Sequence, residues 1–109
     1  AHAVTSSRML HDGVDRDREP SDRGVPDARI DVVTAFHLGT AGGADVLGAP
    51  VGRLSVGMQF DAVVVDTAGR GALRGWSVVD DHARTFEKAV RLTRPADIRS
   101  VWVAGRQVV

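Results

Sequence analysis

The sequence predicts an α/β fold in which helical segments and a terminal hairpin gather around one short apolar strand. Five of the six residues in Phe60–Val65 are apolar and three are consecutive valines, a composition typical of a strand that is covered on both faces. Apolar residues recur at three- and four-residue spacing on both sides of it, which indicates helices. Two β-rich runs close the chain and predict a hairpin.

Length and composition favour one globular domain and exclude several function classes. The 109 residues are 43% hydrophobic and 26% charged, which is too apolar for a disordered chain. The 14 basic and 14 acidic residues cancel, which argues against nucleic-acid and anionic-membrane partners. The absence of cysteine excludes disulfides, thiolate metal sites and a cysteine nucleophile. No run approaches the roughly 18 apolar residues of a membrane span, and no signal peptide opens the chain, so a cytoplasmic location is expected.

The first 50 residues are expected to form helices joined by a charged loop. Residues 1–10 contain no Gly or Pro and predict a helix that stops near Gly13. Because Ala1 falls within this helix, we expect the chain to begin inside a longer protein. The segment Asp12–Arg29 has ten charged residues, two prolines and two glycines, which predicts a solvated loop, with an interaction arm as the alternative.

A second helix is predicted over about Asp31–Leu47, with Asp27 or Asp31 as its cap. Its glycines within Gly39–Gly43 should weaken it by roughly 1 kcal/mol each, which indicates a place where another backbone approaches closely. Gly48 is expected to stop the helix. The periodic face consists of Val33, Phe36, Thr40, Ala44 and Leu47.

The central strand is expected to follow a brief edge strand. Gly52–Gly57 alternates apolar and polar residues, as an edge strand does. Asp61 is the one polar residue of Phe60–Val65, and we expect it near the strand entry, bonded to turn amides. Thr67–Gly75 is rich in Gly and Arg and predicts a turn region.

The last third predicts one helix and the hairpin. Asp80 or Asp81 can cap a helix over about 81–93. Its one-faced pattern consists of Phe86, Ala89, Val90 and Thr93. Ile98–Val103 and Arg106–Val109 would form the hairpin, joined at Ala104-Gly105.

Residues that could carry chemistry are few and scattered. The histidines fit no local metal-ligand motif and are expected at surface or cap positions, except that the ring of His37 is expected to be partly buried beside Phe36. Glu19 falls in the charged loop and Glu87 forms an i,i+4 surface pair with Arg91. Gly39–Gly43 resembles a phosphate loop but lacks the lysine. The residues alone therefore predict no catalytic, cofactor-binding or metal-binding residue; the histidines are His2, His11, His37 and His82.

Three blocks nevertheless resemble the amidohydrolase superfamily in order and spacing. FHLGTAGGADVLG (Phe36–Gly48) is similar to its A-T-x-G-G-A-x-x-L-G helix. VGRLSVGMQFDAVVVD (Val51–Asp66) is similar to its G-x-L-x-x-G-x-x-A-D-x-V-V-x-D segment. IRSVWVAGRQVV (Ile98–Val109) is similar to its V-x-x-V-W-V-x-G-x-x-V closing hairpin. With the segments before and between these blocks, the resemblance covers nearly the whole chain.

Within the superfamily the chain most resembles guanine deaminases. Phe60-Asp61 replaces the usual Ala-Asp, as in many guanine deaminases, and Phe86–Leu92 with the following Arg94–Ile98 resembles their KFLYLGDDRNI region. Two segments depart from that pattern: Asp12–Arg29 is longer and more charged, and Gly69–Gly75 is rich in glycine.

The resemblance implies the C-terminal part of a metal-dependent (β/α)8 barrel hydrolase. Residues 1–50 would end the barrel, and residues 51–109 would supply part of a flanking β-sandwich. Zinc, held by histidines and an aspartate that precede this segment, would activate water to convert guanine to xanthine and ammonia. The implied partners are a purine base, the N-terminal remainder of the same chain and a second copy in a homodimer.

The resemblance further implies that several apolar side chains are buried against N-terminal strands: Leu54, Val56, Phe60, Val63, Val65, Val101 and Val103. Two alternatives remain open. Cytosine deaminases and formiminoglutamate deiminases share the same tail pattern, and a free-standing β-rich interaction module would need no chemistry at all.

Overall fold

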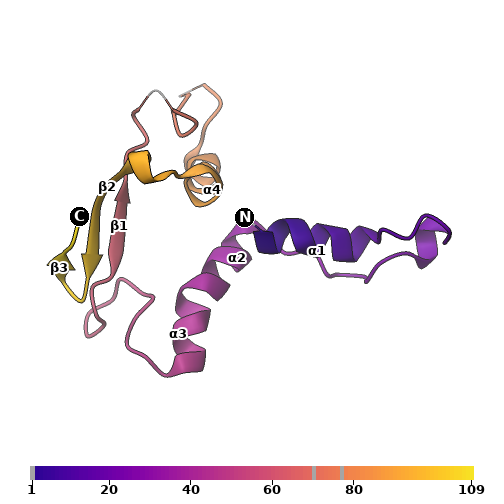
Figure 1. The fold of residues 1–109 in the computed structure, drawn as a ribbon, viewed down its shortest axis with the longest axis horizontal. Coiled ribbons are helices and arrows are strands. Elements are labelled where there is room, and N and C mark those ends of the chain that lie inside the picture. The colour runs from indigo at the N-terminus through magenta and orange to yellow at the C-terminus, as the bar shows by residue number, and fades with distance from the viewer. Residues whose placement is uncertain (1, 70, 77) are drawn as a thin grey trace. The chain divides into compact units, whose positions relative to one another are not determined.

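The computed structural model describes residues 2–69, 71–76 and 78–109, and its elements are shown in Figure 1. The chain divides into two compact units, Ala1–Ala35 and Phe36–Val109. The resemblance implies a different boundary, at residue 50, between the end of a barrel and part of a β-sandwich. That boundary stays a prediction. The elements are α1 His2–Asp12, the 3-10 helix η1 Pro20–Asp22, α2 Val32–Gly39, α3 Ala41–Leu47, β1 Ala62–Val65, α4 His82–Leu92, the 3-10 helix η2 Pro95–Asp97, β2 Ile98–Val103 and β3 Arg106–Gln107.

The first unit is built on α1 and the charged segment that follows it. Gly13 takes a left-handed backbone (φ 69°) and donates its N–H to the Met9 carbonyl, which confirms the predicted helix stop. The segment then returns along the helix: the Ser7 hydroxyl donates to the Val4 carbonyl and accepts from the Ile30 N–H. Apart from the single turn of η1, residues 13–29 form no regular element, as predicted.

The helix predicted over Asp31–Leu47 is interrupted at Thr40, which corrects the prediction of one continuous helix. Asp31 does cap α2, because its carboxylate accepts from the Thr34 N–H at 2.7 Å. The Thr40 hydroxyl donates to the Phe36 carbonyl at 2.8 Å, a local bond that competes with regular helix geometry. With glycines on either side, the chain therefore breaks there and resumes as α3. Gly48 ends α3 in a left-handed conformation (φ 63°), as predicted.

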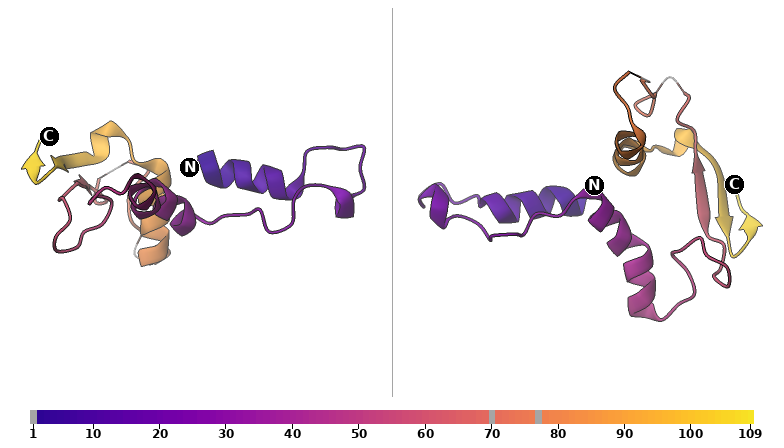
Figure 2. Two further views of the ribbon diagram at one scale, coloured as in Figure 1. Left: turned by 90° about the horizontal axis from the view of Figure 1, so that it is seen from below. Right: turned by 180° about the vertical axis from the view of Figure 1, so that it is seen from behind.

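The sheet has three antiparallel strands in the order β1-β2-β3, which lie side by side in Figure 1 and Figure 2. Val63 pairs with Val101, and a bulge follows between Val64 and Val65. The hairpin turn at Ala104-Gly105 has positive φ at both residues (48° and 78°), which matches the strand twist. The predicted hairpin is thus confirmed, with a shorter last strand than expected.

Two strand predictions are wrong. No strand forms over Gly52–Gly57, because Gly52 and Gly57 both take left-handed backbones (φ 77° and 90°) that no extended strand allows. The central strand begins at Ala62 instead of Phe60. The Asp61 carboxylate accepts from the Ala104 N–H at 2.7 Å, so the prediction that Asp61 binds turn amides at the strand entry is confirmed.

Helix α4 is capped as predicted and is tied to the preceding loop by one carboxylate. Asp81 accepts from the Arg84 N–H at 2.8 Å. One oxygen of Asp80 accepts from the Trp76 N–H and from the Lys88 ammonium. Only 8% of the Asp80 side chain is exposed. The Lys88 hydrogen bond first, and the Trp76 N–H second, hold the pKa of Asp80 below its ordinary value of 3.8.

Acid is therefore expected to release this loop. A carboxylate whose folded pKa is lowered contributes stability that is complete above 3.8 and is lost as the pH falls through the folded value. Thermal midpoints measured from neutral pH to below 3.8 should fall less steeply for Asp80→Asn than for the wild type. Identical slopes for the two proteins would show that the Asp80–Lys88 pair contributes nothing.

Among the described residues, no helix is both long and apolar enough to cross a membrane.

Candidate functional site

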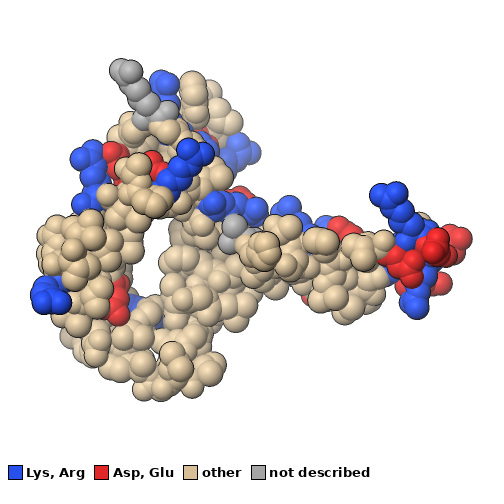
Figure 3. Space-filling model, in the orientation of Figure 1, with Lys and Arg blue, Asp and Glu red and all other residues tan. Residues whose placement is uncertain are grey.

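The second unit carries an open groove, hereafter the apolar groove, with a volume of about 900 Å³. Figure 3 shows the hollow bordered mainly by uncharged residues. Its walls come from α2, the loop after α3, β1, α4 and β2. They consist of Phe36, Thr40, Gly52, Arg53, Leu54, Asp61, Ala62, Val63, Val65, Phe86, Ala89, Val90, Val101, Trp102 and Val103.

The sheet contributes one apolar face to this groove. Val63 in β1 pairs with Val101 in β2, and Val103 follows two residues later, so these three side chains share a face. Val65, beyond the bulge in β1, also lines the groove. This face is only partly covered, since Val63 is 56% and Val103 51% exposed, whereas Val65 and Val101 are half-buried. The prediction that the central strand is covered on both faces is therefore wrong for the described chain, where Val64 on the other face is also 48% exposed.

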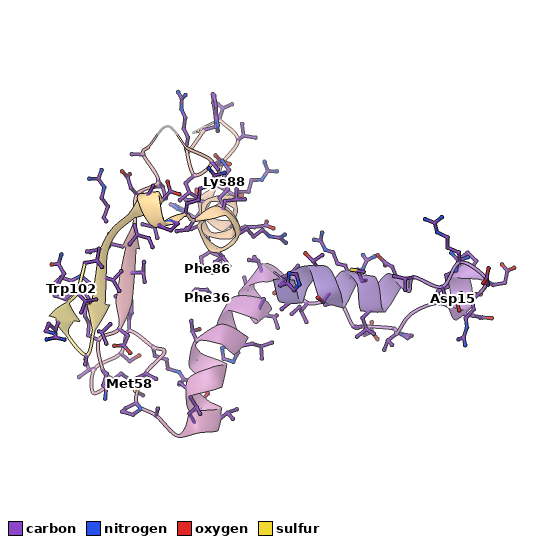
Figure 4. The ribbon with its side chains drawn as sticks, viewed as in Figure 1. Asp15, Phe36, Met58, Phe86, Lys88 and Trp102 are labelled. Carbon is purple, nitrogen blue, oxygen red and sulfur yellow. The ribbon has the colours of Figure 1, made fainter. Side chains whose placement is uncertain are left out.

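An aromatic pair closes the helical side of the groove. The rings of Phe36 in α2 and Phe86 in α4 lie 5.1 Å apart, edge to face at 79°, and Figure 4 shows them pointing toward each other. This geometry suits the ring quadrupoles and adds stability beyond area burial. Both residues belong to predicted apolar helix faces, but their pairing has no signal in the sequence.

The charged groups at the groove are occupied by partners within the unit. Arg53 donates from two nitrogens to both oxygens of Asp45, at 2.7 and 2.6 Å. Each partner stabilises the charge of the other, so the pKa of Asp45 is lowered and that of Arg53 is raised. Asp61 is engaged at the hairpin turn. Because these charges are satisfied locally and most of the wall is apolar, the groove suits the packing of another apolar surface.

The histidines considered as metal ligands do not converge. His2, His37 and His82 are exposed and His11 is partly buried, so the expected partial burial of His37 is wrong. Within residues 2–69, 71–76 and 78–109, no group of three His, Cys, Asp or Glu could hold a metal ion. The described side chains therefore do not fit a zinc site.

The two glutamates considered as residues that could carry chemistry lie in separate segments of the chain. Glu19 is exposed in the charged segment, and Glu87 pairs with Arg91 at 2.8 Å, as predicted. Arg29 pairs with Asp12, whose pKa is lowered chiefly by that hydrogen bond. The prediction that the chain itself holds no catalytic residue stays a prediction.

The close backbone approach expected within Gly39–Gly43 falls at Thr40 and Ala41, between the glycines. Among the described residues, a Cβ at Gly39 would meet nothing within 4 Å, and the atom nearest to a Cβ at Gly42 would be the His37 carbonyl oxygen, at 3.2 Å. A Cβ at Gly52, in contrast, would lie 2.6 Å from the Thr40 carbonyl oxygen. The loop after α3 thus lies against the junction of α2 and α3, inside the stretch where an approaching backbone is predicted. The sequence does not identify Gly52 as the approaching residue, because it belongs to a separate segment.

Comparison with known proteins places the chain in a family. A model of the Amidohydrolase family matches residues 3–108. No curated protein and no solved structure matched the chain. The family match spans almost the whole chain, including both units and all three blocks singled out in the sequence. This chain therefore belongs to the amidohydrolase family of hydrolases.

Proposed function

We propose that residues 1–109 are the C-terminal, scaffold-forming portion of a guanine deaminase-like zinc aminohydrolase, which converts guanine and water to xanthine and ammonia. The observation that carries the proposal is the family match over residues 3–108 on a chain whose apolar groove is open. The full-length enzyme would contain a (β/α)8 barrel that ends in the helices of residues 1–50. Residues 51–109 would form part of its β-sandwich.

The groove supports the scaffold role. Leu54 is 75% exposed and Val56 fully exposed, although both are apolar and belong to the family block that precedes β1. Val63 and Val103 on the sheet face are also more than half exposed. Fully burying an exposed side chain of this kind is favourable by roughly 1.5–3 kcal/mol, and proportionately less for Val63 and Val103, which are already about half-buried. We propose the N-terminal remainder of the same polypeptide as the covering element.

The guanine assignment rests on the finer resemblance. Phe60-Asp61 stands before β1 as in many guanine deaminases, and Phe60 packs edge to face on Trp102 at 5.8 Å. Asp61 fixes the turn between β2 and β3. In this proposal the two residues position the sandwich and take no part in the chemistry. Zinc, when bound by residues outside this chain, supplies a water of lowered pKa.

The proposal is tested with the full-length gene product. Purified with zinc, it is expected to release ammonia and xanthine from guanine, and removal of the metal with a chelator should abolish turnover until zinc is returned. Cytosine and formiminoglutamate serve as comparison substrates at equal concentration. Guanine turnover that does not exceed turnover of either comparison substrate would contradict the guanine assignment while leaving the scaffold role intact.

A second candidate is another deaminase of the same family. The charged segment Asp12–Arg29 favours it for two reasons. This connection is longer than in the guanine deaminase pattern, and its ten charged residues make it more charged. A cytosine deaminase or formiminoglutamate deiminase would then be the parent, and the comparison substrates above identify which. A non-catalytic β-rich module would show turnover of none of the three substrates.

A further inference from the structure

We draw no further inference here: the strongest candidate, the outer edge of strand β1 beside the apolar groove, belongs to the site already described, and nothing in the structure shows which strand would cover it.

Discussion

Val63→Asp is expected to prevent folding of the proposed full-length hydrolase while changing the 109-residue chain little. Val63 lies on the groove face of β1 and is 56% exposed in the chain described here. If the remainder of the enzyme covers this face, the new carboxylate becomes buried without a partner. An unpaired buried charge costs roughly 3–5 kcal/mol, a large share of the roughly 5–15 kcal/mol that stabilises a native protein.

The measurement is the yield of soluble full-length protein, together with the far-ultraviolet circular dichroism of the 109-residue chain. Val78→Asp is the matched control, because Val78 is 96% exposed and does not line the groove. The control should leave both proteins unchanged. Equal yields of the Val63→Asp and Val78→Asp full-length proteins would show that the groove face remains solvated in the enzyme.

Gly52→Ala is expected to destabilise the second unit by roughly 2–5 kcal/mol. Two costs add at this position. An alanine at φ 77° costs roughly 1–2 kcal/mol because of its left-handed backbone. Its Cβ would also lie 2.6 Å from the Thr40 carbonyl oxygen, which already accepts the Ala44 N–H at 3.0 Å in the first turn of α3.

Gly57→Ala separates these two costs. Gly57 has φ 90°, and a Cβ added there meets nothing within 4 Å, so only the backbone cost of roughly 1–2 kcal/mol applies. Urea unfolding, followed by circular dichroism, should give a clearly lower midpoint for Gly52→Ala than for Gly57→Ala. Equal midpoints would mean that the contact between Gly52 and Thr40 is relaxed at no cost.

Elements with local signals could be predicted from the sequence. Helix α4 has both a one-faced apolar pattern and an aspartate whose carboxylate reaches the Arg84 N–H. The turn at Ala104-Gly105 needs only two residues that accept positive φ between β-rich runs. Gly13 and Gly48 end helices for the same local reason. Such features depend on neighbours a few residues away, which a sequence displays directly.

Elements in which local backbone geometry overrides the side-chain pattern could not be predicted from the sequence. Alternation of Leu54 and Val56 with polar residues predicted a strand at Gly52–Gly57, but no partner strand pairs with it among the described residues, and its two glycines turn the chain instead. The break at Thr40 depends on a hydroxyl bond to Phe36 that competes with an otherwise consistent helical pattern. In both cases the order of apolar and polar side chains fits the predicted element, but the backbone geometry of particular residues determines the structure that forms.

The candidate site was foreseen only in parts. The sequence identified the apolar residues of β1 and β2 and the helix faces that carry Phe36 and Phe86. It did not show that these walls enclose one groove, because the two phenylalanines are far apart in the chain and meet only in the fold. The ion pair between Asp45 and Arg53 likewise joins a helix to a loop and has no motif of its own.

Hydrogen–deuterium exchange of the peptide Phe60–Val65 tests the account most directly. Exchange reports the local opening of individual segments. Among the described residues β1 is paired on the β2 side only, so in the 109-residue chain part of its amides should exchange rapidly. In the full-length hydrolase the same peptide should exchange at least about tenfold more slowly, equivalent to about 1.4 kcal/mol of added protection. Equal exchange in the two proteins would contradict the claim that this chain is a scaffold completed by the rest of the enzyme.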